Sequence, residues 1–194
     1  MISFSAYLAE SKNNGVVAAF GRFSPPTIGH GLLVKKVMDT AKAHNADHVV
    51  YLSKTQDKKK NPLDISTKMK WAKKMFPGAN ITAADEHLRT FIDMAAALNM
   101  VYKVLYLVAG SDRVAEYQKL LDKYNGVAYQ YDKIVVVSAG ERDPDEEGAA
   151  GMSASKMRVH AAAGHLSEFK KGLPDHMHNQ AQAMMDDVRK GMGI

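Results

Sequence analysis

The segment that most constrains the fold is a short apolar run followed by a turn rich in glycine and proline and then by a helical pattern. Residues 15–20 read Gly-Val-Val-Ala-Ala-Phe, and residues 31–38 read Gly-Leu-Leu-Val-Lys-Lys-Val-Met. The first run suits a buried strand, and the second has apolar side chains at helical spacing. A tight turn between a strand and a helix directs backbone N–H groups toward an anion. The segment therefore predicts a first βα unit with an anion-binding turn at residues 21–30.

The same alternation of strand and helix continues along the chain. Strands are predicted at residues 16–20, 47–52, 81, 104–109 and 133–137. Helices are predicted at residues 30–44, from a cap at Ser66 to about 76, at 90–98, at 114–124, from Ser153 onward, and within 166–190. This alternation favours a parallel sheet built from βαβ units. The predicted fold class is α/β, a Rossmann-like doubly wound parallel sheet with a helical C-terminal extension.

The expected organisation is a main domain over residues 15–164, preceded by a leader or N-terminal helix at 1–14 and followed by a helical part at 165–194. Ligands of doubly wound sheets bind beyond the carboxyl ends of the strands. Four polar motifs follow predicted strand ends, at residues 21–30, 58–60, 110–112 and 153–158. These motifs are therefore expected to form one site. An acidic, glycine-rich loop is expected at residues 140–151.

Composition favours an anionic partner, and a nucleoside triphosphate fits this as well as nucleic acid does. The 194 residues carry a formal net charge of +5 and include no cysteine, so disulfides and thiol catalysis are excluded. No apolar run approaches the roughly 18 residues that a membrane span needs, and no membrane partner is expected. The chain lacks a basic stripe interleaved with aromatic residues, which argues against nucleic acid.

The glycine turn also carries a recognisable spacing. Gly21, Phe23, Pro25 and the pair at residues 29–30 (Gly-His) resemble the signature of the nucleotidylyltransferase superfamily, which includes nicotinamide mononucleotide, phosphopantetheine and cytidylyl transferases. The usual form of the signature is His-x-Gly-His, whereas residues 27–30 read Thr-Ile-Gly-His. Threonine at the first position also occurs in some adenylyltransferases of the family.

A second motif lies near the predicted last strand. Residues 152–158 resemble the family segment Ile-Ser-Ser-Thr-x-Ile-Arg, with Ser153, Ser155 and Arg158 at the matching positions. Ser155 and Arg158 are three residues apart and face the same side of a helix, whose N-terminus carries partial positive charge. That arrangement suits the β and γ phosphates of a triphosphate. The alternative is a simple serine N-cap.

Two shorter motifs resemble parts of the same family. Lys58, Lys59 and Lys60 are similar to a Ser-Lys-Lys-Pro stretch of phosphopantetheine adenylyltransferases, and Lys60 is the favoured phosphate ligand. The alternative is a solvated loop. Residues 110–112, Gly-Ser-Asp, resemble the Gly-Ala-Asp of nicotinamide mononucleotide adenylyltransferases. Asp112 would bind a ribose hydroxyl or the acceptor, or it would cap the following helix.

The resemblance implies transfer of a nucleoside monophosphate, with AMP from ATP favoured, to a phosphate-bearing acceptor such as nicotinamide mononucleotide, with release of pyrophosphate. It implies that His30 donates to an α-phosphate oxygen and that Thr27 adds a hydroxyl donor. The nucleotide would lie against Gly21, Phe23, Ser24 and Gly29, and against Ser153, Ser155 and Arg158. Mg²⁺ would arrive on the phosphates, and no protein metal site is expected.

Two alternatives remain from the sequence: cytidylyl transfer to a phosphorylated alcohol, and a non-catalytic nucleotide-binding protein of a phage virion. Residues 1–10 resemble leaders of proteins packaged into heads of tailed bacteriophages, and residues 8–10, Leu-Ala-Glu, fit the cleavage sequence. A plain amphipathic helix fits this stretch equally well. The expected location is the cytoplasm, of the host if the gene belongs to a phage, with packaging into the virion as the alternative. A homo-oligomer is also left open.

Overall fold

The computed structural model describes residues 14–140 and 152–194, and the expectations for the leader and for most of the acidic loop lie outside these residues. Its centre is a five-stranded sheet in the order β3-β2-β1-β4-β5, in which every neighbouring pair is parallel. The strands are β1 (Gly15–Gly21), β2 (Asp47–Leu52), β3 (Ile81–Ala83), β4 (Val104–Ala109) and β5 (Lys133–Ser138). The predicted Rossmann-like α/β class is confirmed.

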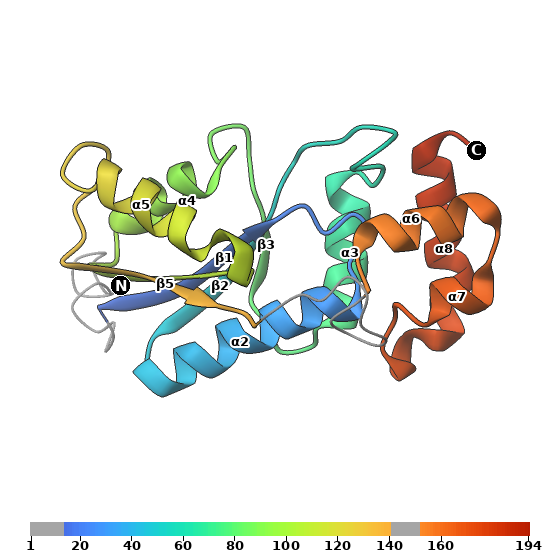
Figure 1. Cartoon of the computed structure of the whole chain (residues 1–194), viewed down its shortest axis with the longest axis horizontal. Coiled ribbons are helices and arrows are strands. Elements are labelled where there is room, and N and C mark those ends of the chain that lie inside the picture. Colours follow the sequence, from blue (N-terminus) through green and yellow to red (C-terminus); the bar gives the residue numbers. More distant parts are fainter. Residues whose placement is uncertain (1–13, 141–151) are drawn as a thin grey trace, which may run out of the picture.

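Helices cover both faces of this sheet, as Figure 1 shows, with α2 on one face and α4 and α5 on the other. The bounds are α2 (Ile28–His44), α3 (Ile65–Met75), α4 (Phe91–Asn99), a 3₁₀ turn η1 (Ser111–Arg113) and α5 (Val114–Tyr124). Two apolar cores result, one on each face of the sheet. Residues 16–19 of β1 have at most 1% of their surface exposed, which explains why this strand is a continuous apolar run.

The C-terminal helices complete the core on the α2 side of the sheet. They are α6 (Ala154–Ala163), α7 (Leu166–Lys170), a 3₁₀ segment η2 (Asp175–Gln180) and α8 (Ala181–Met192). Side-chain hydrogen bonds tie α8 to α3 and α6. Trp71 Nε1 donates to Asp187 at 2.9 Å, and Arg189 Nη1 donates to the carbonyl oxygen of Ala161, near the end of α6, at 2.6 Å. The helical extension therefore supports both α3 and α6.

The predicted cap of α3 is wrong by two residues. Asp64, not Ser66, is the N-cap, and its carboxylate accepts a hydrogen bond from the backbone N–H of Thr67 at 3.0 Å. The hydroxyls of Ser66 and Thr67 donate to the same carboxylate, and these bonds hold the pKa of Asp64 well below its usual range. A carboxylate that accepts several donors caps this helix better than the single Ser66 hydroxyl would.

In the two described stretches, every helix is too short or too polar to cross a lipid bilayer.

Candidate functional site

A pocket of about 850 Å³ opens at the carboxyl ends of the strands. It lies where the strand order reverses between β1 and β4, the usual ligand position in doubly wound sheets. The residues to which the sequence analysis gave a catalytic, nucleotide-binding or acceptor-binding role all line this one pocket. These residues are Gly21, Phe23, Ser24, Thr27, Gly29, His30, Lys60, Asp112, Ser153, Ser155 and Arg158.

The turn between β1 and α2 begins with a close contact that explains two residues of its motif. Phe23 is buried and has a φ of +46°, so the chain reverses direction and brings its ring back over Gly21. A Cβ on residue 21 would lie 2.6 Å from that ring, and glycine therefore fits where other residues would clash. The Phe23 ring stacks on the His30 imidazole, with the ring centroids 4.4 Å apart.

Thr27 and His30 form a reciprocal cap at the N-terminus of α2. The Thr27 hydroxyl accepts from the His30 backbone N–H at 3.3 Å, and His30 Nδ1 accepts from the Thr27 backbone N–H at 3.1 Å. Because a backbone N–H can only donate, Nδ1 must be the unprotonated nitrogen. In the neutral ring, Nε2 then carries the proton and is the nitrogen able to donate. The Thr27 hydroxyl also lies 3.0 Å from Nδ1 and donates to the Met152 carbonyl at 3.2 Å.

The second motif reaches the same pocket from the N-terminus of α6. Ser153 is the N-cap and accepts from the backbone N–H of Lys156 at 3.2 Å. Arg158 donates to the Ser155 hydroxyl and to the carbonyl of Ser24, both at 2.9 Å. The two motifs are therefore joined directly, and the pocket lies between the N-termini of two helices, which both favour an anion.

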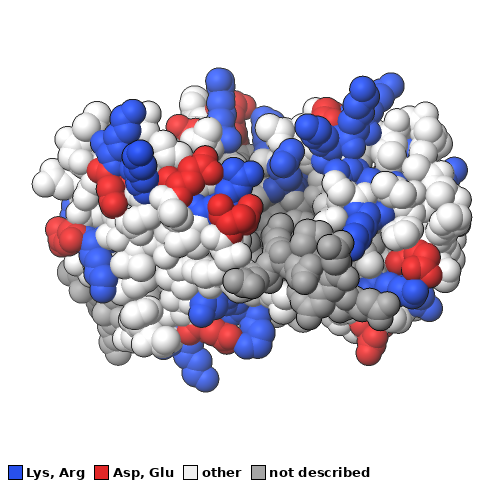
Figure 2. Space-filling view, in the orientation of Figure 1, with Lys and Arg blue, Asp and Glu red and all other residues white. Residues whose placement is uncertain are grey.

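The lysine loop after β2 is an ordered turn. Asp57 and Asn61 pair through their backbones, and the Asp57 carboxylate accepts from the backbone N–H groups of Lys59 and Lys60 at 2.9 and 2.6 Å. These bonds lower the pKa of Asp57. Lys60 lines the pocket, whereas the adjacent Lys58 and Lys59 do not. Figure 2 shows basic side chains gathered over this loop and α3.

Asp112 lies just after β4, within η1, and lines the pocket. Its carboxylate is exposed and pairs with Arg113 at 3.4 Å. It is not the N-cap of η1 or of α5, and neither of those N-caps makes a side-chain hydrogen bond. The helix-cap alternative for Asp112 is therefore wrong, and its carboxylate is left at the pocket wall.

The pocket lining is strongly cationic. Among its described residues are five lysine or arginine side chains and a single carboxylate, Asp112. The basic members are Arg22, Lys60, Arg89, Arg113 and Arg158. Such an excess of positive charge in a concave site favours a multiply charged anion. Burial lowers the pKa of Arg158, and the positive charge of Arg22 lowers it further.

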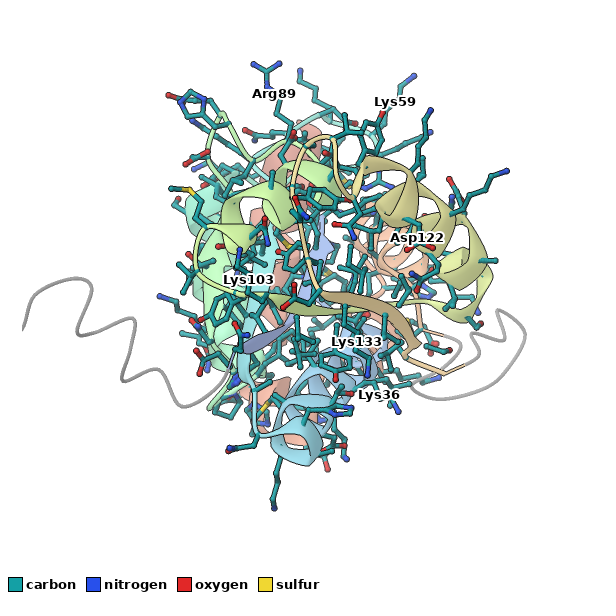
Figure 3. The ribbon with its side chains drawn as sticks, turned by 90° about the vertical axis from the view of Figure 1, so that its left-hand side faces the viewer. Lys36, Lys59, Arg89, Lys103, Asp122 and Lys133 are labelled. Atoms are coloured by element: carbon teal, nitrogen blue, oxygen red, sulfur yellow. The ribbon has the colours of Figure 1, made fainter. Side chains whose placement is uncertain are left out.

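Sequence reasoning assigned no role to Arg22, Arg89 or Arg113. Each of these residues closely follows β1, β3 or β4, so the strand-end rule that located the other motifs also covers them. Figure 3 shows that the side chain of Arg89 extends on the same side of the molecule as that of Lys59. Basic side chains from two loops that are far apart in the sequence therefore lie on the same side of the molecule.

Comparison of the sequence with family models and with curated proteins gave no match. Solved structures with a similar fold include TmcAL of Thermotoga maritima, bound with alpha-thio ATP, at a TM-score of 0.53 and 11% identity, over 92% of this chain and 56% of that one. A macrolide-efflux protein from Streptococcus pneumoniae gives a TM-score of 0.48 at 18% identity, over 85% and 57%. This chain spans less than two thirds of either protein. The likeness to TmcAL shows a shared fold.

Proposed function

We propose that this protein is a nucleotidylyltransferase that transfers a nucleoside monophosphate, AMP from ATP in the first instance, to a phosphate-bearing acceptor. The observation that carries the proposal is the pairing in one pocket of His30, whose proton is fixed on Nε2, with Arg158 at the N-terminus of α6. The cationic lining favours a triphosphate as the ligand. The TmcAL structure, which shares the fold, contains alpha-thio ATP.

The proposed reaction is an in-line displacement without a covalent enzyme intermediate. An oxygen of the acceptor phosphate forms a bond to the α-phosphorus, the bond from that phosphorus to the bridging oxygen of the β-phosphate breaks, and pyrophosphate leaves. His30 Nε2–H donates to an α-phosphate oxygen as charge develops there. Lys60 adds a flexible positive charge at the reacting phosphate. Ser153, Ser155 and Arg158 hold the leaving pyrophosphate.

Thr27 contributes to this scheme through His30. Its hydroxyl contacts His30 Nδ1, the His30 backbone N–H and the Met152 carbonyl, and its side chain is buried. Gly21, Phe23, Ser24 and Gly29 form the main-chain wall against which the nucleotide lies. Asp112 and the neighbouring Arg113 form the acceptor side of the pocket.

The donor set suits magnesium that arrives with the substrate. Among the described residues, no three His, Cys, Asp or Glu side chains are grouped to hold a metal ion, and Asp112 is the one described carboxylate in the pocket lining. Mg²⁺ commonly keeps several waters and binds substrate phosphates with one or two carboxylates. On the phosphates it would neutralise charge near the α-phosphorus.

A pyrophosphate-release assay tests the proposal. The pure protein is incubated with Mg²⁺ and either ATP or CTP, together with nicotinamide mononucleotide, phosphopantetheine or glycerol phosphate. ATP with nicotinamide mononucleotide is expected to give pyrophosphate and a dinucleotide. Turnover of CTP with a phosphorylated alcohol, and not of ATP, would favour a cytidylyltransferase. Tight binding of a triphosphate without turnover with any acceptor would favour a non-catalytic nucleotide-binding protein.

A further inference from the structure

Lys68 is a lysine whose side chain is fully buried. It lies on α3, outside the pocket lining, with 0% of its surface exposed. Its ammonium donates to the carbonyl oxygen of Ser53 at 3.0 Å and to that of Thr55 at 2.7 Å. Within residues 14–140 and 152–194 it forms no ion pair. A buried ammonium whose hydrogen-bond partners are only carbonyl groups lowers the stability of the folded state. Stability therefore does not explain why a lysine stands at this position.

The two carbonyl groups belong to the start of the lysine loop. The Thr55 carbonyl also accepts a hydrogen bond from Asn61 Nδ2, which donates to the Thr55 hydroxyl at 2.6 Å as well. Asn61 in turn pairs through its backbone with Asp57, whose carboxylate orients the backbone of Lys60. A continuous set of hydrogen bonds therefore runs from the Lys68 ammonium to the turn that carries Lys60.

The far end of the loop is fixed to the first motif. The backbone N–H of Leu63 donates to the Ser24 hydroxyl at 3.1 Å, and the Ser24 carbonyl accepts from Arg158. The loop is thus held at Ser24 on one side and by Lys68 on the other. Ser53, Thr55 and Lys60, which share this framework, all line the pocket.

We propose that Lys68 is a positioning residue, whose buried ammonium holds residues 53–61 in the shape that presents Lys60 to the reacting phosphate. The role given to Lys60 rests on the proposed function, whereas the shape of the loop does not. Loss of the ammonium releases the carbonyls of Ser53 and Thr55, and the Asp57–Asn61 turn then moves relative to the pocket.

The ammonium can be removed by pH as well as by mutation. Burial lowers the pKa of Lys68 to about 8, and the positive charge of Arg22 adds to this effect, while Asp64 and Asp57 oppose it. The parent protein therefore loses the positioning charge as the pH rises through about 8. The neutral amine keeps two N–H donors, so a rise in pH weakens this contact and does not remove it.

The first experiment measures hydrogen exchange in the protein without ligand. Lys68→Met keeps an unbranched side chain of similar length, and Lys73→Met, at an exposed position on the same helix, is the matched control. Exchange at residues 57–61 is expected to quicken at least tenfold in Lys68→Met and to stay at the parent rate in Lys73→Met. Parent-like protection at residues 57–61 in Lys68→Met would overturn the proposal.

The second experiment asks whether Lys68 acts through Lys60. Lys68→Met, Lys60→Ala and the double variant are compared for kcat and KM with ATP. Each single variant should lower kcat more than it raises KM, and the double variant should be no slower than Lys60→Ala. Losses that multiply in the double variant would show that Lys68 does not act through Lys60. A parent protein that turns over no triphosphate would refute the proposed function, and the exchange data would still decide the role of Lys68 in the loop.

Discussion

Replacement of His30 by alanine removes two contributions that can be measured separately. The first is the transition-state donor that we propose, and loss of one such preorganised group typically lowers kcat by about 10²- to 10³-fold. The second is structural. The Thr27 backbone N–H loses its acceptor and Phe23 loses a stacking partner, each worth about 0.5–1.5 kcal/mol. Unfolding free energy should fall by about 1–3 kcal/mol, or roughly 2–4 °C in Tm for each kcal/mol.

The assay measures pyrophosphate release with ATP, Mg²⁺ and nicotinamide mononucleotide, together with thermal unfolding of the same preparations. Triphosphate affinity should stay within a few fold of the parent, because the phosphate contacts proposed at α6 are unchanged. His30→Gln is the matched variant, since glutamine at this helix position can still accept from the Thr27 N–H. Relative to His30→Ala, His30→Gln should restore a larger fraction of the loss in Tm than of the loss in kcat. A folded His30→Ala protein with the parent kcat would refute the catalytic role.

Three further changes test other parts of the structure. Arg158→Ala should weaken binding of a non-hydrolysable triphosphate about 10- to 100-fold, because a charge-assisted phosphate contact is lost. Calorimetry measures this affinity, and Val159→Ala, at an exposed position, is the control. Gly191→Ala should lower Tm, since the new Cβ would clash with the Pro62 carbonyl oxygen. A rise in Tm, as for an ordinary helical glycine, would contradict this contact. In denaturant unfolding, the stability of the parent relative to Lys68→Met should rise by up to about 3 kcal/mol between pH 8 and 10.5. Native Lys68 loses its proton near 8 and unfolded Lys68 near 10.5, so a difference that stays constant with pH would contradict the burial of the charge.

The sheet could be predicted because its strands are runs of apolar residues that are followed directly by polar residues. β4 (Val104–Ala109) and helix α5 (Val114–Tyr124) have the predicted bounds, and the polar residues between them mark the strand end. Once the strands are parallel, all their carboxyl ends lie at one edge. The convergence of four motifs on one pocket follows from that geometry and from the strand order, without knowledge of any side-chain contact.

The parts that could not be predicted depend on contacts between distant segments. Lys68 is one of several lysines in α3, and nothing in the sequence distinguishes it from the exposed Lys73. Its burial results from the packing of α3 beneath the loop after β2. The hydrogen bond from Trp71 to Asp187 joins residues that are 116 positions apart, and it also depends on the packing of distant segments. The Trp71 ring is buried in the core, and helical periodicity could not predict its hydrogen-bond partner.

The threonine at position 27 stands where the family signature usually has a histidine, and its geometry gives a reason why this is compatible with catalysis. Threonine is among the residues that cap a helix well through the side-chain oxygen. Here the cap is reciprocal, because the Thr27 backbone N–H donates to His30 Nδ1 while the Thr27 hydroxyl accepts from the His30 backbone. One imidazole is absent, but the tautomer of the other is fixed by a backbone group that cannot change its role as a donor. If this reasoning is correct, Thr27→Ser should retain most of the activity of the parent, whereas Thr27→Val, which preserves the shape of the side chain but cannot accept the His30 N–H, should lower both Tm and kcat.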